Sequence, residues 1–222
     1  MYECDAISKD DESICSKSGD NDLCLVEFSI EKRDVCEKIS NIGIRKACEG
    51  LIKGTYTLCE DLETQTRKDI CYETFGRYKP DCSACEEIES SYYKDDCFDA
   101  CTIGTGNYYY CSYLSTEYRR DNCYYNYAIA RNTYEPCDEI KLDMLRRLCF
   151  ENVAVNLRKP IICEFIDGEY EIYCYSKVIT LKDVPIENCM EMSPSYTRDQ
   201  CVMNVVKNTG NITYCENIDD QS

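Results

Sequence analysis

Hydrophobic positions recur along the chain with a period of 26 residues, and cysteine marks that period. One cysteine series falls at positions 59, 85, 111, 137, 163, 189 and 215, and a second at 71, 97, 123, 149, 174 and 201. An aliphatic residue stands three positions after each cysteine of the first series: Leu62, Ile88, Leu114, Ile140, Ile166, Met192 and Ile218. That spacing places cysteine and aliphatic side chain on one helical face. Internal repetition is therefore the main organising feature.

Each period predicts a short helix followed by a longer one. Pro136, Pro160 and Pro185 lie near the start of short helices, where the missing N–H of proline costs least. The best example of the longer helix runs from Asp143 to Arg158. Its predicted apolar stripe consists of Leu145, Leu148, Cys149, Val153 and Leu157.

The predicted fold class is all-α: an array of disulfide-stapled helical hairpins, with short and long helices alternating as an α-solenoid similar in general architecture to tetratricopeptide arrays. Residues 59–222 would hold the tandem 26-residue repeats. Residues 1–58 are less regular, and we expect one or more divergent N-terminal capping repeats there, since the terminal repeats of solenoids have a modified face. The whole chain would form one continuous solenoid domain.

Hairpin geometry predicts a disulfide map. If Cys85 bonds Cys97 across an antiparallel hairpin, Cys82 and Cys101 lie one turn further along both helices and form a second rung. The predicted pairs are Cys36–Cys48, Cys59–Cys71, Cys85–Cys97, Cys82–Cys101, Cys111–Cys123, Cys137–Cys149, Cys163–Cys174 and Cys189–Cys201. Cys15 and Cys215 are left as orphans or as candidates for intermolecular bonds, and the pairing among Cys4, Cys15 and Cys24 stays open.

A rival map joins each long helix to the next short one. Its pairs are 71–85, 97–111, 123–137, 149–163, 174–189 and 201–215, with 4–15, 24–36, 48–59 and 82–101 added. It uses all 20 cysteines, which is its advantage. We favour the hairpin map because Cys215 opens a repeat whose long helix is expected beyond Ser222.

Composition predicts a secreted or cell-surface protein. Twenty cysteines in 222 residues indicate an oxidising compartment. No apolar run approaches the length needed to span a bilayer, so we expect any signal segment or anchor to lie outside the given sequence. With 25 Lys and Arg against 42 Asp and Glu, the net charge of −17 argues against nucleic acid as a partner.

The candidate chemistry points away from an enzyme. The chain has no histidine, which removes the commonest general base and His-ligated zinc. The single close CxxC, Cys82 and Cys85, fits a structural disulfide better than a metal or redox centre. Paired carboxylates such as Glu86-Glu87, Asp95-Asp96 and Asp219-Asp220 are interpreted as a solvated face. We assign no catalytic, cofactor-binding or metal-ligating residue and expect no cofactor.

Tyrosine is the most suggestive residue for binding. The candidate binding surface consists of Tyr92, Tyr93, Tyr108, Tyr109, Tyr110, Tyr124 and Tyr125. Three neighbours in a row cannot all face one core, and exposed tyrosine offers a large contact area at small entropic cost. The alternative, tyrosine as core filler, is about equally favoured. Asn211 begins the single N-x-[ST] acceptor and is the candidate glycosylation site.

The recurring C-x-x-I and R-D-x-C-Y patterns support a resemblance. The segment RRDNCYYNYAIA, from Arg119 to Ala130, is the best match to the Cys-rich helical repeats of exported archaeal proteins, and the resemblance covers roughly residues 36–218. It implies an exported or surface repeat architecture and no particular activity. The repeat around Cys174 departs from the pattern because it lacks the basic pair. Locally, the hairpin of Cys82, Cys85, Cys97 and Cys101 is similar to disulfide-stapled α-hairpins.

Two functions follow as hypotheses. The first is a non-enzymatic binding or adhesion module for a protein or a glycan, because solenoids offer extended binding faces. The alternative is a structural subunit of a surface layer or an extracellular filament, which assembles head to tail. The expected partner is therefore a protein, a glycan or a second copy of the chain.

Overall fold

The computed structural model describes residues 2–32, 34–79, 82–192 and 195–218, with the side chains of 2–4 and 195–196 outside that description. The described residues form helices and connecting turns, with no strand among them. The predicted all-α fold of disulfide-stapled hairpins is therefore confirmed. The chain divides into two compact units, Met1–Arg119 and Arg120–Ser222. This division differs from the expected boundary at residue 58, and the single continuous domain stays a prediction.

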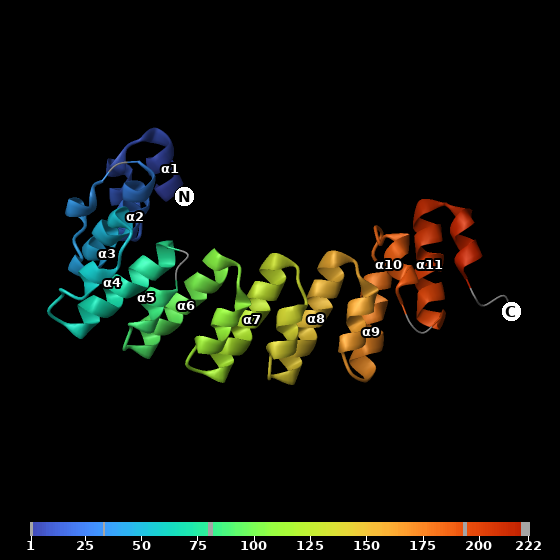
Figure 1. Cartoon of the computed structure of the whole chain (residues 1–222). Helices are drawn as coiled ribbons and strands as arrows, with labels where there is room; N and C mark the ends of the chain where they lie inside the picture. Colours follow the sequence, from blue (N-terminus) through green and yellow to red (C-terminus); the bar gives the residue numbers. More distant parts are fainter. Residues whose placement is uncertain (1, 33, 80–81, 193–194, 219–222) are drawn as a thin grey trace. The chain divides into compact units, whose positions relative to one another are not determined.

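Short and long helices alternate along each unit (Figure 1). The first unit contains α1 (Tyr2–Lys9), η1 (Glu12–Lys17), α2 (Asn21–Glu31), η2 (Cys36–Lys38), α3 (Ile42–Lys53), η3 (Thr57–Cys59), α4 (Gln65–Tyr78), α5 (Ser83–Glu86), α6 (Ser91–Thr105) and η4 (Tyr108–Tyr113). Helix α7 (Glu117–Arg131) includes the boundary between the units. The second unit continues with η5 (Glu135–Glu139), α8 (Asp143–Leu157), η6 (Pro160–Phe165), α9 (Glu169–Ile179), α10 (Ile186–Met190), α11 (Ser195–Thr209) and η7 (Ile212–Asn217).

Most of the short helices are 3₁₀ helices, whereas the sequence pattern predicts only that short helices form there. The backbone N–H of the aliphatic residue three positions after the cysteine donates to the cysteine carbonyl, as in Leu114 to Cys111 at 3.2 Å and Ile166 to Cys163 at 3.0 Å. A three-residue hydrogen-bonded turn places cysteine and aliphatic residue directly above one another. The aliphatic residues are buried at every described repeat except the last, where Ile218 is half-buried.

The long helix α8 spans almost the predicted residues, but its buried face is shifted. It ends at Leu157, and Arg158 closes it in the left-handed conformation with φ of 56°. The prediction for Leu148 is wrong, since 41% of its side chain is exposed. The buried face consists instead of Cys149, Phe150, Val153 and Ala154. The disulfide at Cys149 orients the helix, so the residue immediately after the cysteine turns inward.

Disulfides connect the two helices of each hairpin, and their cysteines are buried. The structure contains the pairs Cys36–Cys48, Cys59–Cys71, Cys82–Cys101, Cys85–Cys97, Cys137–Cys149, Cys163–Cys174 and Cys189–Cys201. All of these pairs agree with the hairpin map, and all except Cys82–Cys101, which both maps contain, contradict the rival one. Cys111 and Cys123 are also disulfide-bonded; their pairing with each other stays a prediction. The expectation of an orphan Cys15 is wrong, because Cys15 bonds Cys24 where α2 packs on η1.

Small residues on the long helices make room for the next disulfide. A methyl group at Gly76 of α4 would lie 2.5 Å from Cys97 Sγ, which is closer than atoms can approach. Thr102 occupies the same position on α6, and its Oγ1 lies 4.0 Å from Cys111 Sγ. Both residues stand five positions after the cysteine of their long helix. On α2, α7 and α8 the equivalent residues are also small, and all three are buried: Ser29, Ala128 and Ala154. The disulfide of one hairpin therefore packs against the preceding long helix.

A buried aspartate joins successive hairpins. Asp69 of α4 accepts hydrogen bonds from the backbone N–H of Glu89 and of Ser90, both at 3.1 Å, at the start of α6. Asp121 does the same for Lys141 and Leu142 at the start of α8. We call this contact the aspartate clamp. It satisfies N–H groups that a helix start leaves unpaired, and its charge matches the positive end of the helix dipole.

The clamp recurs at Asp22 and Asp95, which also stand two residues before a long-helix cysteine. Asp22 binds Ser40 and Asn41, and Asp95 binds the backbone and the hydroxyl of Ser115. These contacts correct part of the solvated-face interpretation, because Asp95 is buried. Its carboxylate is a structural group.

Arg147 replaces the clamp aspartate on α8. Its guanidinium carbon lies 3.9 Å from the centre of the Tyr170 ring, at the start of α9. The start of α9 differs as well, since Gly168 precedes it with φ of 71°. At this junction a cation–π contact between Arg147 and Tyr170 therefore stands where other junctions have the clamp.

Candidate functional site

An aromatic cluster surrounds the 3₁₀ helix η4 in the first unit. The ring of Tyr113 lies 4.9 Å from buried Phe98 and 5.6 Å from Tyr109, and Tyr110 lies 6.2 Å from Phe98. Tyr109 and Tyr113 are exposed, while Tyr110 is half-buried. Phe98 thus supports a group of rings that reach the solvent. We call Phe98, Tyr109, Tyr110 and Tyr113 the η4 aromatic cluster.

The predicted tyrosines do not all belong to one surface. Tyr92 is exposed and packs edge-on against half-buried Tyr93, with ring centres 5.3 Å apart. Tyr108 is half-buried. Tyr124 is a wrong prediction, since it is 7% exposed and belongs to the core. Tyr125 is half-buried, and its hydroxyl accepts a hydrogen bond from Asn152 at 2.9 Å.

Tyr124 is buried because it directly follows a long-helix cysteine. The residues at this position are also buried in most of the other long helices: Leu25, Tyr72, Phe98, Phe150, Tyr175 and Val202. Each is hydrophobic, and the disulfide turns it inward. The cysteine period marks this position in the sequence, while the disulfide decides that it faces the core.

A second recurring position places large side chains in the solvent. The second residue of α6, α7, α8 and α9 is Tyr92, Tyr118, Met144 or Tyr170, and these are 62%, 74%, 68% and 52% exposed. They stand 26 residues apart in the sequence. We call these four the helix-start residues. Tyr118, Met144 and Tyr170 directly follow Glu117, Asp143 and Glu169.

Sequence reasoning missed this set, although its period was visible. Tyr118 and Tyr170 lie outside the tyrosine runs that drew attention, and Met144 is a different residue type. The second unit has further exposed hydrophobic side chains on α9, at Ile172 and Tyr173. A core role does not account for large hydrophobic side chains that are exposed at the same position of successive hairpins, so the helix-start residues of each unit are candidate contact sites.

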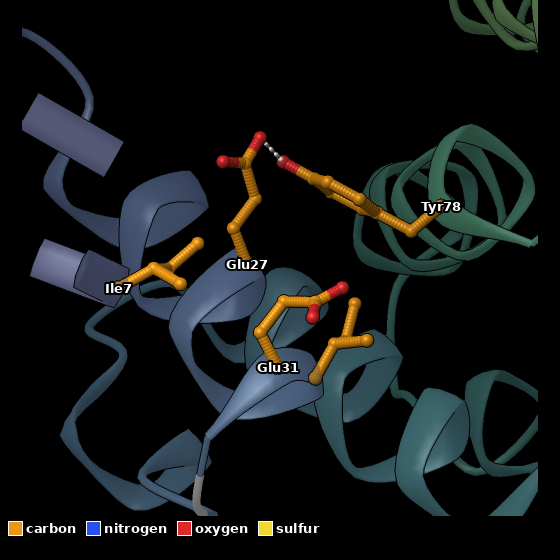
Figure 2. Close-up of a pocket in the computed structure, with 5 residues that line it drawn as sticks. Ile7, Glu27, Glu31 and Tyr78 are labelled. Atoms are coloured by element: carbon orange, nitrogen blue, oxygen red, sulfur yellow. Dashed lines mark hydrogen bonds between the residues drawn. The ribbon is translucent and has the colours of Figure 1, made fainter. Parts of the chain in front are cut away.

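A pocket of about 380 Å³ opens between α1, α2 and the end of α4. Its lining consists of Ile7, Glu27, Ile30, Glu31 and Tyr78, and we call it the Tyr78 pocket. Figure 2 shows Glu27 and Tyr78 facing each other across it, with a hydrogen bond of 3.4 Å from the Tyr78 hydroxyl to Glu27 Oε1. Burial and the nearby Glu27 carboxylate raise the pKa of Tyr78, so this hydroxyl stays protonated at neutral pH.

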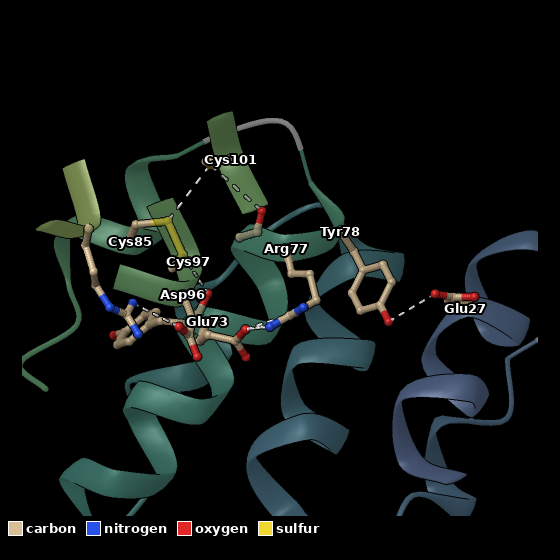
Figure 3. Close-up of polar contacts among 11 residues, drawn as sticks. Glu27, Glu73, Arg77, Tyr78, Cys85, Asp96, Cys97 and Cys101 are labelled. Carbon is tan, nitrogen blue, oxygen red and sulfur yellow. Dashed lines mark hydrogen bonds and ion pairs between the residues drawn. A yellow bond between two sulfur atoms is a disulfide. The ribbon is translucent and has the colours of Figure 1, made fainter. Parts of the chain in front are cut away.

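The neighbouring side chains of α4 point elsewhere. Arg77 Nε donates to Glu73 Oε1 at 2.9 Å, one turn back along the same helix, as Figure 3 shows. Burial raises the pKa of Glu73, and the attraction of Arg77 offsets part of that rise. The guanidinium of Arg77 is therefore paired outside the Tyr78 pocket, and the described lining of the pocket includes two carboxylates.

The remaining predicted residues lie at the end of the second unit. Cys215 is a free and exposed thiol on η7. Asn211 is exposed at the start of η7, where its Oδ1 accepts hydrogen bonds from the backbone N–H and the hydroxyl of Thr213. Glycosylation there stays a prediction. The carboxylates Asp219 and Asp220 lie outside the described residues.

Among the described residues, no group of three or more cysteine, aspartate or glutamate side chains is placed to hold a metal ion. None of the helices in this part of the chain is both long and apolar enough to cross a bilayer.

Comparison with known proteins returns no match: no protein-family model, no curated protein and no solved structure matches this chain. The resemblance to exported archaeal repeats therefore stays a prediction. Function is inferred from the described side chains alone.

Proposed function

We propose that this protein is a non-enzymatic extracellular or cell-surface module that binds a protein or a glycan. The supporting observation is the set of helix-start residues. The hydrophobic effect favours burial of apolar side chains in the core. The four helix-start residues are exposed instead, at the same position of their helices: Tyr92, Tyr118, Met144 and Tyr170. Tyrosine and methionine are enriched in protein interfaces.

The disulfides support an oxidising environment for this function. Each hairpin is small, and its core contains a buried disulfide in place of a larger set of aliphatic side chains. In a reducing compartment such cysteine pairs would stay reduced and would not form disulfides. Secretion or display at the cell surface is therefore part of the proposal.

Acidic residues next to the helix-start residues limit which class of partner can bind. Glu117, Asp143 and Glu169 each precede a helix-start residue, and the net charge of the chain is −17. A basic or neutral partner that offers apolar contact area fits these positions, and a polyanion does not. Sugar rings satisfy the requirement with their C–H faces and hydroxyl groups, and a basic polypeptide satisfies it with its charge.

A binding experiment with position-matched variants tests the proposal. Ligands would be selected on a glycan array and from a displayed peptide library with the full chain, and their affinity then measured for Tyr92→Ser/Tyr118→Ser and for Met144→Ser/Tyr170→Ser. We expect at least one pair to weaken binding about tenfold or more. The control removes exposed hydrophobic residues away from the repeat position, with Ile103→Ser/Met203→Ser. Equal losses in control and test variants, or no loss in either test pair, would contradict the proposal.

A second candidate function is head-to-tail assembly into a layer or filament. It is favoured by η7, where Cys215 is free and Ile212 is strongly exposed, whereas the short-helix cysteines from Cys15 to Cys189 are bonded. A disulfide between copies would give a ladder on a non-reducing gel that disappears on reduction and in Cys215→Ser. A single monomeric band under oxidising conditions would exclude covalent assembly.

A further inference from the structure

Tyr109 and Tyr113 of the η4 aromatic cluster are two phenols that are in contact with each other and are both exposed. They stand four positions apart in the sequence, and their ring centres lie 5.6 Å apart with the ring planes at 76°. Their exposed fractions are 59% and 43%. Burial in a core explains many contacts between aromatic rings, but it does not explain this one, because both side chains remain in solvent.

The core holds one ring of the pair in place. Tyr113 stacks on Phe98, with ring centres 4.9 Å apart and planes 26° apart, and Phe98 is buried. Tyr109 is the more exposed of the two and lies against the edge of this supported ring. Exposed side chains rotate within picoseconds to nanoseconds, so Tyr109 can turn while Tyr113 keeps its position.

The hydroxyl ends of the two side chains lie near each other. The Tyr109 hydroxyl raises the pKa of Tyr113, an effect that requires the two phenolic oxygens to be close. When a phenol loses a hydrogen atom, much of the unpaired spin resides on the two ring carbons beside the hydroxyl-bearing carbon. The pair therefore brings together the ring positions at which phenoxyl radicals couple.

We propose that Tyr109 and Tyr113 are a site of oxidative cross-linking, in which a carbon–carbon bond forms between their rings at the positions next to the hydroxyl groups. The oxidant is hydrogen peroxide, used by a haem peroxidase that removes one hydrogen atom from each phenol. The two phenoxyl radicals join, and the ring hydrogen at each end of the new bond moves to the phenolic oxygen, which restores both aromatic rings. The peroxide is reduced to two molecules of water, so atoms and electrons balance.

The product is a covalent link across η4. It would hold the exposed rings of the η4 aromatic cluster in one arrangement and add a carbon–carbon bond to a chain otherwise cross-linked through sulfur. The reaction requires no binding partner and none of the helix-start residues. It therefore adds a modification site to the proposed binding module and is independent of that proposal.

Treatment of the full-length oxidised protein with a haem peroxidase and hydrogen peroxide tests the site. Cys215 is alkylated beforehand, because a free thiol would reduce phenoxyl radicals. At low protein concentration we expect a monomer on a denaturing gel, dityrosine fluorescence, and a peptide containing Tyr109 and Tyr113 that has lost the mass of two hydrogen atoms. Absence of this peptide, or cross-links that form only between chains, would overturn the proposal.

Conservative variants assign the two partners. Tyr109→Phe and Tyr113→Phe should each abolish the cross-link within η4, because phenylalanine keeps the ring and removes the hydroxyl hydrogen that the oxidant takes. The control Tyr92→Phe changes a similarly exposed tyrosine, whose ring lies 5.3 Å from that of half-buried Tyr93, and should leave the yield of the η4 cross-link unchanged. A cross-link that persists in either η4 variant, or that disappears in Tyr92→Phe, would show that these two residues are not the site.

Discussion

At the scale of single residues, close contacts with sulfur restrict side-chain size. Gly76 is the clearest case, because the disulfide Cys85–Cys97 lies directly against its Cα. Both sulfur atoms lie within 3.1 Å of the place that a Cβ would occupy. Neither atom can move away, since each is held in the core of the next hairpin.

The variant Gly76→Ala should lower the free energy of unfolding by about 1–3 kcal/mol, the usual cost of overpacking a rigid core. Urea unfolding followed by circular dichroism measures it. Gly104→Ala on α6 is the matched control, because nothing lies within 4 Å of its Cβ position. There the same change should stabilise the helix by about 0.5–1 kcal/mol. Two variants of equal stability would refute the role of the disulfide.

The pKa of Glu73 provides a second prediction at this scale. Burial raises it, and Arg77 holds it lower than burial alone would. Between the ordinary and the raised pKa, the folded state retains a proton that the unfolded state has released. The contribution of this group to stability therefore falls as the pH rises through that interval.

Removing the cation with Arg77→Met should raise the pKa of Glu73 further, which NMR titration of its carboxyl carbon measures. Arg67→Met is the control, since Arg67 is paired with Glu63, which lies just before α4, and not with Glu73. A midpoint that stays in place in Arg77→Met, or that moves equally in Arg67→Met, would show that the ion pair does not set this pKa.

At the scale of elements, the aspartate clamp couples each long helix to the start of the next. Removing the Asp69 carboxylate would leave the N–H groups of Glu89 and Ser90 without their acceptors in a partly buried site. Solvent can replace such bonds only in part. The start of α6 should therefore fray before the rest of the hairpin.

We expect Asp69→Ala to cost about 1–3 kcal/mol of stability. Hydrogen exchange should also accelerate at the amides of Glu89 and Ser90. Asp61→Ala changes an exposed aspartate in the same unit and should have little effect. If the two amides exchange at the same rate in Asp69→Ala as in the wild type, the clamp does not hold the helix start.

The helices also show which structural features the sequence pattern predicts and which it does not. Cysteine spacing predicts the hairpins and their pairs because a sulfur bridge demands closely spaced backbones, here with Cα atoms 5.6 Å apart in Cys59–Cys71 and Cys85–Cys97. It does not predict that Leu148 faces solvent or that Tyr124 faces the core, because helical periodicity fixes an interval and leaves the rotation of the helix open. The disulfide fixes that rotation.

At the scale of the whole molecule, covalent cross-links replace an extensive aliphatic core. Each hairpin bond closes a loop of similar length, and by the loop-entropy model such a bond contributes about 3 kcal/mol. Several of them together equal or exceed the net stability of a typical domain, which is about 5–15 kcal/mol.

Full reduction at neutral pH should therefore abolish most of the helical circular dichroism signal. Peptide mapping without reduction should recover Cys15–Cys24 and Cys85–Cys97 as linked peptides, and iodoacetamide should label Cys215 in the native protein. Retained helicity after complete reduction, or peptides linked as 71–85, would contradict this account of stability.

The sequence by itself determines the all-α class, the hairpin period and the cysteine pairs of the regular hairpins, since each follows from distances along a single helix or turn, but it leaves Cys15–Cys24 open. Only the tertiary structure decides which recurring side chains are exposed. Tyr118 and Tyr124 are both tyrosines of α7, yet one lies in solvent and the other in the core. The Tyr78 pocket likewise requires α1, α2 and α4 to lie next to one another. No local sequence pattern predicts it, because it depends on how neighbouring hairpins pack.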